Sequence, residues 1–137
     1  MTDGGDVRVP HWHINNYGKL ELGVQGPKGR GWLHYHSPQI FTADALGQWT
    51  HLAVVYDHIG NRVAHYVNGQ LVQEETMQLD LALRIGDAEL GNWNMARHRN
   101  PSAVRFFTGC MDEFLLFSRA LSDEEIERHC LEGRPQE

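Results

Sequence analysis

Four histidines, arranged as two pairs, have the spacing best suited to metal chemistry in this sequence. His11 is followed by His13, and His34 by His36, with one residue between the members of each pair. Side chains two positions apart in a strand point to the same face, so each pair would present two imidazoles together. If the two strands were neighbours, four imidazoles would converge into a ligand set that Zn²⁺ binds. Alternatively, the histidines are the solvated half of two half-buried strands, and no carboxylate lies near either pair in sequence to orient the rings.

Other motifs of catalysis are missing, and the two cysteines do not supply one. The sequence contains no G-x-S-x-G, H-E-x-x-H, P-loop or dinucleotide-binding pattern. Cys110 and Cys130 lack the neighbours of a metal-binding or catalytic cysteine. They either form a disulfide or are two small buried residues, and the sequence leaves both alternatives open.

The charge and hydropathy of the chain argue against two classes of partner. The 137 residues include 18 Asp and Glu against 12 Lys and Arg, which gives a formal net charge of -6. Because the basic residues are also scattered, nucleic acid is not an expected partner. No apolar run approaches the roughly 18 residues that cross a bilayer, so we expect no membrane insertion within this segment. No signal-peptide pattern is visible.

The elements that must position these residues are strands, and the clearest are three consecutive strands within residues 49–74. Residues 49–56 are rich in β-branched and aromatic side chains, and a polar turn leads from them to a strand at 62–67. Asn68 and Gly69 supply the two positive φ angles of a type I′ hairpin, after which residues 70–74 return. We expect this antiparallel meander to organise the fold.

Shorter strands are expected on both sides of the meander, at residues 7–15, 19–25, 32–37, 81–85 and 106–117. Pro10 lacks a backbone donor, which places the first strand at a sheet edge or a bulge. The last strand is expected to be buried on both faces in its second half. About eight short strands with turns between them indicate an all-β fold, an antiparallel β-sandwich or jelly roll.

One short helix is expected at the C-terminal end. Ser122, with Glu125 three residues later, has the pattern of a capping box. Leu121 and Ile126 have the spacing of a hydrophobic staple. Gly133 is positioned to end the helix, and the proline two residues beyond it prevents continuation.

Three sequence features follow one another in a diagnostic order. They are W-T-H-L-A-V-V-Y-D at 49–57 with Y-V-N-G at 66–69, L-R-I-G at 83–86, and F-T-G-C-M-D-E-F-L-L-F-S-R-A-L-S-D-E-E-I at 107–126. Together they resemble the laminin-G-like jelly-roll domains of the concanavalin A-like lectin/glucanase superfamily, tightly over residues 49–133 and loosely over 7–48. The resemblance implies one such domain over residues 1–137. It also implies that the one or two usual N-terminal strands are missing, so that the chain is a fragment of a longer protein.

The resemblance raises the question of hydrolysis, which the carboxylates do not support. A glucanase needs two carboxylates flanking the glycosidic bond, and such enzymes usually carry them in an E-x-D-x-x-E pattern that is absent here. Asp112 and Glu113 are adjacent, so on a strand they would point to opposite faces and make structural hydrogen bonds. We therefore expect no enzyme activity and no catalytic residue. A degenerate glycan hydrolase that depends on Glu113 is the first alternative.

The resemblance also implies candidate ligand sites. Relatives often hold calcium, which takes six to eight oxygen ligands. One loop contains four possible calcium ligands, Asp87, Glu89, Asn92 and Asn94. They do not match the full ligand set of a relative. The alternative is a loop held by Asx-type hydrogen bonds. Sugar binding needs exposed aromatic rings with polar groups beside them. At least one of the aromatic candidates named next is instead expected to pack in the core. The candidate ligand-binding residues are Trp32, Tyr35, His34, His36 and Trp93.

These expectations favour a non-catalytic recognition module that binds carbohydrate or protein. The resemblance places such modules in larger bacterial proteins that are extracytoplasmic, whether periplasmic, cell-surface or secreted, including sensor and adhesion proteins. An unpaired edge beside residues 106–117 would be covered by a second copy of the chain, so a homo-oligomer is expected. A purely structural oligomerising domain is the second alternative.

Overall fold

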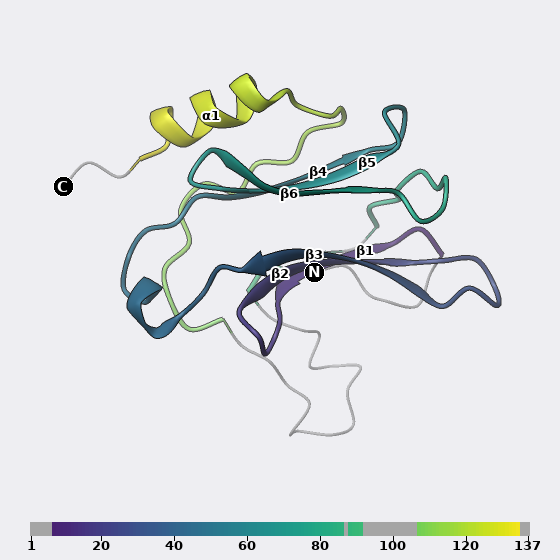
Figure 1. Ribbon diagram of the computed structural model, residues 1–137, viewed down its shortest axis with the longest axis horizontal. Helices are drawn as coiled ribbons and strands as arrows, with labels where there is room; N and C mark the ends of the chain where they lie inside the picture. Colours follow the sequence, from purple (N-terminus) through teal and green to yellow (C-terminus); the bar gives the residue numbers. More distant parts are fainter. Residues whose placement is uncertain (1–6, 87, 92–106, 135–137) are drawn as a thin grey trace.

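The computed structural model describes residues 7–86, 88–91 and 107–134. Within these residues, six strands form two three-stranded antiparallel sheets, in the orders β1-β2-β3 and β4-β5-β6. The sheets lie face to face as two layers, and the helix α1 lies on the outer side of the β4-β5-β6 layer (Figure 1). The predicted all-β sandwich with a short C-terminal helix is therefore confirmed.

The first sheet consists of β1 (Pro10–Ile14), β2 (Lys19–Gln25) and β3 (Trp32–Gln39). Strict alternation in β2 buries Leu20, Leu22 and Val24 on one face. The strand β1 forms an edge of the sheet, where Pro10 costs least because one side of the strand needs no donor. The predicted first strand is shorter than expected, since Arg8 adopts a φ of 76° in a turn. β3 extends beyond Ser37, past a register irregularity opposite the start of β2.

The second sheet is the predicted meander, with β4 (Leu52–Asp57), β5 (Arg62–Val67) and β6 (Gln70–Thr76). A short 3₁₀ turn, Ala43–Ala45, lies in the connection from β3 to β4. Asn68 and Gly69 have φ angles of 51° and 81°, which confirms the type I′ hairpin between β5 and β6. β4 begins three residues later than predicted, so Trp49 lies outside the strand and is exposed.

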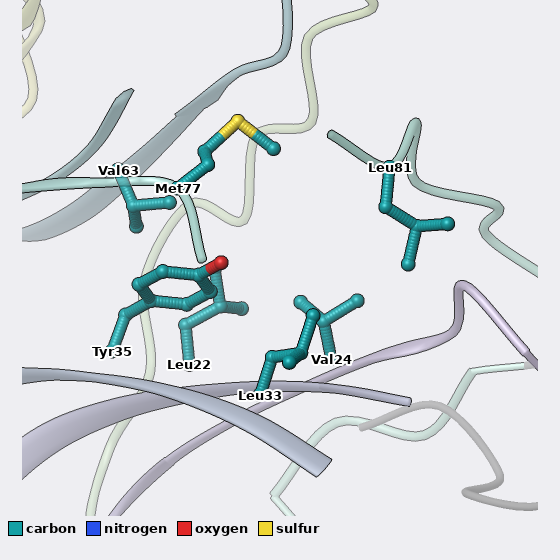
Figure 2. Packing of buried hydrophobic residues seen from close by; sticks show 7 residues of the cluster. All are labelled: Leu22, Val24, Leu33, Tyr35, Val63, Met77 and Leu81. Carbon is teal, nitrogen blue, oxygen red and sulfur yellow. The ribbon is translucent and has the colours of Figure 1, made fainter. Parts of the chain in front are cut away.

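The main core lies between the two sheets. Figure 2 shows its seven residues: Leu22, Val24, Leu33, Tyr35, Val63, Met77 and Leu81. Four come from β2 and β3, one from β5, and two from the segment after β6. Two tyrosine hydroxyls, one from each sheet, bind the segment after β6 at this point. The Tyr35 Oη accepts a hydrogen bond from the Gln78 N–H at 3.0 Å, and the Tyr56 Oη donates to the Leu81 carbonyl at 2.5 Å.

A second apolar cluster fixes α1 (Asp123–Glu132) to the outer face of the β4-β5-β6 sheet. Its buried residues are Val55, Ala64, Tyr66, Leu121 and Ile126. Ser122 and Glu125 form the predicted capping box, and the residues of the predicted hydrophobic staple are both buried in the cluster. The Tyr66 hydroxyl donates to Asp123 Oδ1 at 2.7 Å, so the first turn of the helix is bound to β5.

Two predicted strands are not strands. Residues 81–85 have no strand structure: Leu81 enters the core, and the Arg84 N–H donates to the Arg8 carbonyl beside the first sheet. Residues 107–117, the described part of the predicted last strand, are irregular and exposed. Neither segment pairs with a described strand. Because the backbone groups of a strand need a hydrogen-bonded neighbour, neither segment is a strand. The large apolar side chains of the second segment are 43–63% exposed: Phe107, Met111, Phe114, Leu115, Leu116 and Phe117.

The two cysteines are both free. Cys130 is buried against the β5–β6 hairpin, whereas Cys110 is exposed within the irregular segment. The disulfide alternative is therefore not realised, and only one of the two cysteines serves as a small buried residue.

Candidate functional site

The outer face of the β1-β2-β3 sheet carries both histidine pairs. The ladder registers place His13, Glu21 and His36 in one cross-strand row, and His11, Gly23 and His34 in the next row. Residues directly opposite in an antiparallel ladder point to the same face. The zinc hypothesis required the two histidine strands to be neighbours. They are not, because β2 lies between them. The central strand thereby places a carboxylate between the two pairs.

Glu21 is the centre of the cluster. Its Oε1 lies 2.7 Å from His34 Nδ1, and its Oε2 lies 3.2 Å from His36 Nε2 and 3.8 Å from His13 Nε2. Asn15 donates a further hydrogen bond, from Nδ2 to Oε2, at 3.1 Å. The Glu21 side chain is 13% exposed, whereas the side chains of His34 and His36 are 44% and 41% exposed. A nearly buried carboxylate thus lies beside two more accessible imidazoles, whereas His13 is as little exposed as Glu21.

The surroundings of Glu21 favour its ionised form. Partial burial by itself raises the pKa of this carboxyl, but the hydrogen bonds from Asn15 and His34 and the proximity of His13 and His36 outweigh it. The pKa is therefore lowered from its ordinary value. At neutral pH the cluster contains a carboxylate anion that can accept hydrogen bonds or bind a cation.

An aromatic surface adjoins the cluster. The ring of Trp32, half-buried, lies against the backbone of Gly23, where an added Cβ would be 3.3 Å from Trp32 Cε3. The His11 ring meets the Trp32 ring edge-on at 6.3 Å between centroids, and the His34 ring lies 6.5 Å from it. The absence of a side chain at Gly23 therefore makes room for the indole ring on this face.

On the other side of Glu21 the same face forms an open depression of about 610 Å³. Its lining residues are Asn15, Tyr17, Lys19, Glu21, His36 and Gln39. They provide amides, a hydroxyl, an ammonium group, an imidazole and a carboxylate. Tyr17, at the rim, is 75% exposed. Glu21 and His36 belong both to the histidine cluster and to the depression, so the two features are continuous.

Other predicted site residues lie elsewhere. Tyr35 is fully buried, which is the core-packing role that the sequence left open for at least one aromatic candidate. Alternation along β3 turns it away from His34 and His36. Trp93 and the candidate calcium ligands Asp87, Asn92 and Asn94 lie outside the described residues. Glu89, the described member of that loop, is half-buried.

Sequence reasoning missed Glu21. One signal for it was available, because the alternation in K-L-E-L-G places Lys19, Glu21 and Gly23 on the polar face of β2. What the sequence lacked was the strand order. Only the placement of β2 between β1 and β3 brings this carboxylate to the histidines, which are 8 and 13 residues away from it in the chain (His13 and His34).

Comparisons with known proteins agree with this architecture. A laminin G family model, described as the concanavalin A-like lectin/glucanases superfamily, matches residues 3–127. No curated protein matches the chain. The fold is similar to that of an S-layer domain-containing protein (residues 221–444) from Clostridium thermocellum, with a TM-score of 0.51 and 23% identity. That match covers 94% of this chain and 59% of the other, so the chain spans about three fifths of that structure. The chain belongs to the concanavalin A-like lectin/glucanase superfamily.

Proposed function

We propose that this domain is a non-catalytic recognition module that binds a carbohydrate on the outer face of the β1-β2-β3 sheet. The observation that carries the proposal is the continuity of the Trp32 ring, the Glu21 cluster and the polar depression along one face. Membership in a superfamily of lectins and glucanases supports the same class of ligand.

The chemistry of this face suits a sugar. Aromatic rings stack on the apolar face of a pyranose, and Trp32 presents a half-buried ring beside Gly23. Sugar hydroxyls both donate and accept hydrogen bonds, so they pair with amides, carboxylates and ammonium groups. Asn15, Gln39 and Lys19 supply such groups in the depression. Its volume of about 610 Å³ lies within the usual range for a small-ligand site.

The single carboxylate that lines the depression supports binding without hydrolysis. A glycoside hydrolase uses two carboxylates roughly 5–9 Å apart, and Glu21 is the only carboxylate among the six residues that line the depression. The imidazoles and the amide already engage both oxygens of this group. Turnover of a bound polysaccharide would contradict this part of the proposal, and loss of that turnover in Glu113→Gln would favour the degenerate hydrolase.

A glycan array tests the proposal, followed by titration of the best ligand into purified variants. Trp32→Ala should weaken binding by at least about 10-fold, because a stacking surface worth more than 1.4 kcal/mol is lost. Trp49→Ala is the matched control, since Trp49 is 56% exposed and lies outside this face. Equal binding by both variants, or silence of the wild-type protein on the array, would contradict the proposal.

We further propose that the module acts outside the cytoplasm, at the cell surface or in a secreted or periplasmic protein, as part of a longer chain. The S-layer domain-containing protein with a similar fold supports this location. Among the described residues no helix is both long enough and apolar enough to cross a membrane. Fractionation of cells that express the natural gene should recover the domain in the extracytoplasmic fraction; recovery in the cytoplasm would contradict the proposal.

A second candidate function is self-association, and the exposed apolar segment at 107–117 favours it. Its six large apolar side chains are about half exposed. Contiguous apolar surface of this kind marks interaction sites on soluble proteins. A second copy of the chain is the proposed occupant, and light scattering at micromolar concentration should then report a dimer that Phe114→Glu with Leu116→Glu dissociates. A wild-type monomer would contradict it.

A further inference from the structure

We propose that Glu21, His34 and His36 bind a Zn²⁺ ion on the outer face of the β1-β2-β3 sheet, with a fourth position left for an external ligand. The ligand atoms of these three residues lie within 4.8 Å of one another. Two imidazoles and one carboxylate are a ligand set that zinc takes in sites with an open position.

The present geometry needs only a small adjustment to hold the ion. In a tetrahedral site with bonds of about 2.0–2.2 Å, the ligand atoms are about 3.3–3.5 Å apart. His34 Nδ1 and His36 Nε2 already lie 2.7 Å and 3.2 Å from the two Glu21 oxygens. The two imidazoles are more than 40% exposed, so their rings can turn toward a shared ion, while the carboxylate at 13% exposure stays in place.

Hydrogen bonds from neighbouring groups position the three proposed zinc-binding residues, as such bonds do in established metal sites. Asn15 Nδ2 donates to Glu21 Oε2 at 3.1 Å and fixes the plane of the carboxylate. The His36 backbone N–H donates to Glu75 Oε1 at 2.8 Å, which ties β3 to β6 at the ligand position. The Gln78 side chain donates to the His34 carbonyl at 2.7 Å. Both histidine positions on β3 are therefore anchored to the segment that contains β6 and Gln78.

The donor atoms select the class of ion. Calcium and magnesium prefer oxygen ligands throughout and take six or more of them. Imidazole nitrogen combined with carboxylate favours zinc and the neighbouring transition metals. The site thus differs in its residues and in its chemistry from the set of oxygen donors that the family resemblance suggests. Its test uses the metal alone, so it does not depend on whether the domain binds a sugar.

A tag-free protein, stripped of metal by chelation, is titrated with Zn²⁺ in a calorimeter. One equivalent should bind saturably. Glu21→Gln should weaken the affinity by at least about 10-fold, and His34→Ala combined with His36→Ala should abolish saturable binding. Co²⁺ added in place of zinc should develop the visible absorption of a low-symmetry nitrogen and oxygen site, and this absorption should be lost in the same variants.

His58→Ala is the matched control. His58 Nδ1 lies 2.8 Å from Asp80 Oδ1 and its side chain is 43% exposed, so it is a single histidine–carboxylate pair of similar exposure. Its replacement should leave zinc binding unchanged. Thermal denaturation of each metal-free variant verifies that it is folded. Absence of saturable binding in the wild type, or unchanged affinity in folded Glu21→Gln and in the folded double variant, would overturn the proposal.

Discussion

The two outer faces of the sandwich differ in what each sheet presents. The β4-β5-β6 sheet presents Val55, Ala64 and Tyr66, and Ile126 of α1 covers them together with Leu121, which precedes the helix. The β1-β2-β3 sheet presents imidazoles, a carboxylate and an indole instead, and no described helix or strand covers this face (Figure 1). Both sheets bury their inner face in the same core. The side chains on the second face of each strand therefore decide whether a sheet receives a covering helix or remains available as a site.

The largest expected difference concerns the packing of the helix. Ile126→Ala should lower the free energy of unfolding by about 2–5 kcal/mol, because it leaves a cavity between α1 and the sheet. His34→Ala on the other face should change it by no more than about 0.5 kcal/mol, because that side chain is 44% exposed. Urea denaturation followed by circular dichroism measures both. Similar losses in the two variants would contradict the comparison.

Two glycines provide a sharper version of the same test. Gly69 has a φ of 81°, and an added Cβ would lie 3.2 Å from the Cys130 Cβ and the Glu127 Cα. Gly69→Ala should therefore cost about 2 kcal/mol or more, since a left-handed backbone alone costs an alanine about 1–2 kcal/mol. At Gly23 the atoms nearest to an added Cβ would belong to the Trp32 ring, at 3.3 Å, and to the His11 carbonyl oxygen, at 3.7 Å.

The side chain of Trp32 is half-buried and can shift, so Gly23→Ala should change tryptophan fluorescence with a smaller effect on stability than Gly69→Ala. Thermal and urea denaturation give the stabilities, and emission spectra report on the indole. A larger stability loss at Gly23 than at Gly69 would mean that the outer face of the β1-β2-β3 sheet is the more tightly packed one.

Removal of the Tyr66 hydroxyl tests how much its hydrogen bond to α1 stabilises the fold. Tyr66→Phe removes the hydrogen bond to Asp123 Oδ1 at 2.7 Å and should cost about 1–2 kcal/mol, because the acceptor is exposed and regains water. Tyr17→Phe is the control on the other sheet, where the residue is 75% exposed and no change is expected. Chemical denaturation distinguishes the two, and an unchanged stability in Tyr66→Phe would contradict a structural role for this bond.

The smallest effect concerns pH. His65 on β5 is fully buried, and burial lowers its pKa from the ordinary value of 6.5; the Tyr35 backbone and the Glu75 carboxylate oppose this shift, and His36 adds to it. Well above pH 6.5 His65 is neutral in both the folded and the unfolded chain. Below pH 6.5 the unfolded chain takes up a proton at His65 that the folded chain does not. The free energy of unfolding therefore decreases as the pH decreases, until the pH reaches the lowered pKa of His65 in the folded state.

This contribution cannot exceed about 1.4 kcal/mol per pH unit. It should disappear in His65→Gln, so the difference in unfolding free energy between wild type and variant should narrow as the pH falls from 7 to 5.5. Denaturation in EDTA-containing buffers at several pH values measures this difference. A difference that stays constant over that range would show that His65 titrates alike in both states.

Much of the fold could be predicted from local patterns. The β2 and β5 strands lie at the predicted residues, the Asn68-Gly69 turn has its two positive φ angles, and the capping box starts α1 after Ser122. Each of these features has a pattern that is visible in residues close in sequence. The segment at 107–117 has an equally strong apolar pattern, yet it is irregular and exposed. Apolar residues alone do not form a strand when no described strand pairs with them.

The sequence by itself determined that His11 and His13, and likewise His34 and His36, would share one side of a strand, because alternation is a property of the extended backbone. It could not determine that both pairs would point outward on one sheet or that Glu21 would lie between them. Strand order decided this, and strand order follows from how the buried faces of distant segments pack into a common core. The candidate site is therefore a product of tertiary structure, assembled from side chains whose local pattern indicates only a polar face.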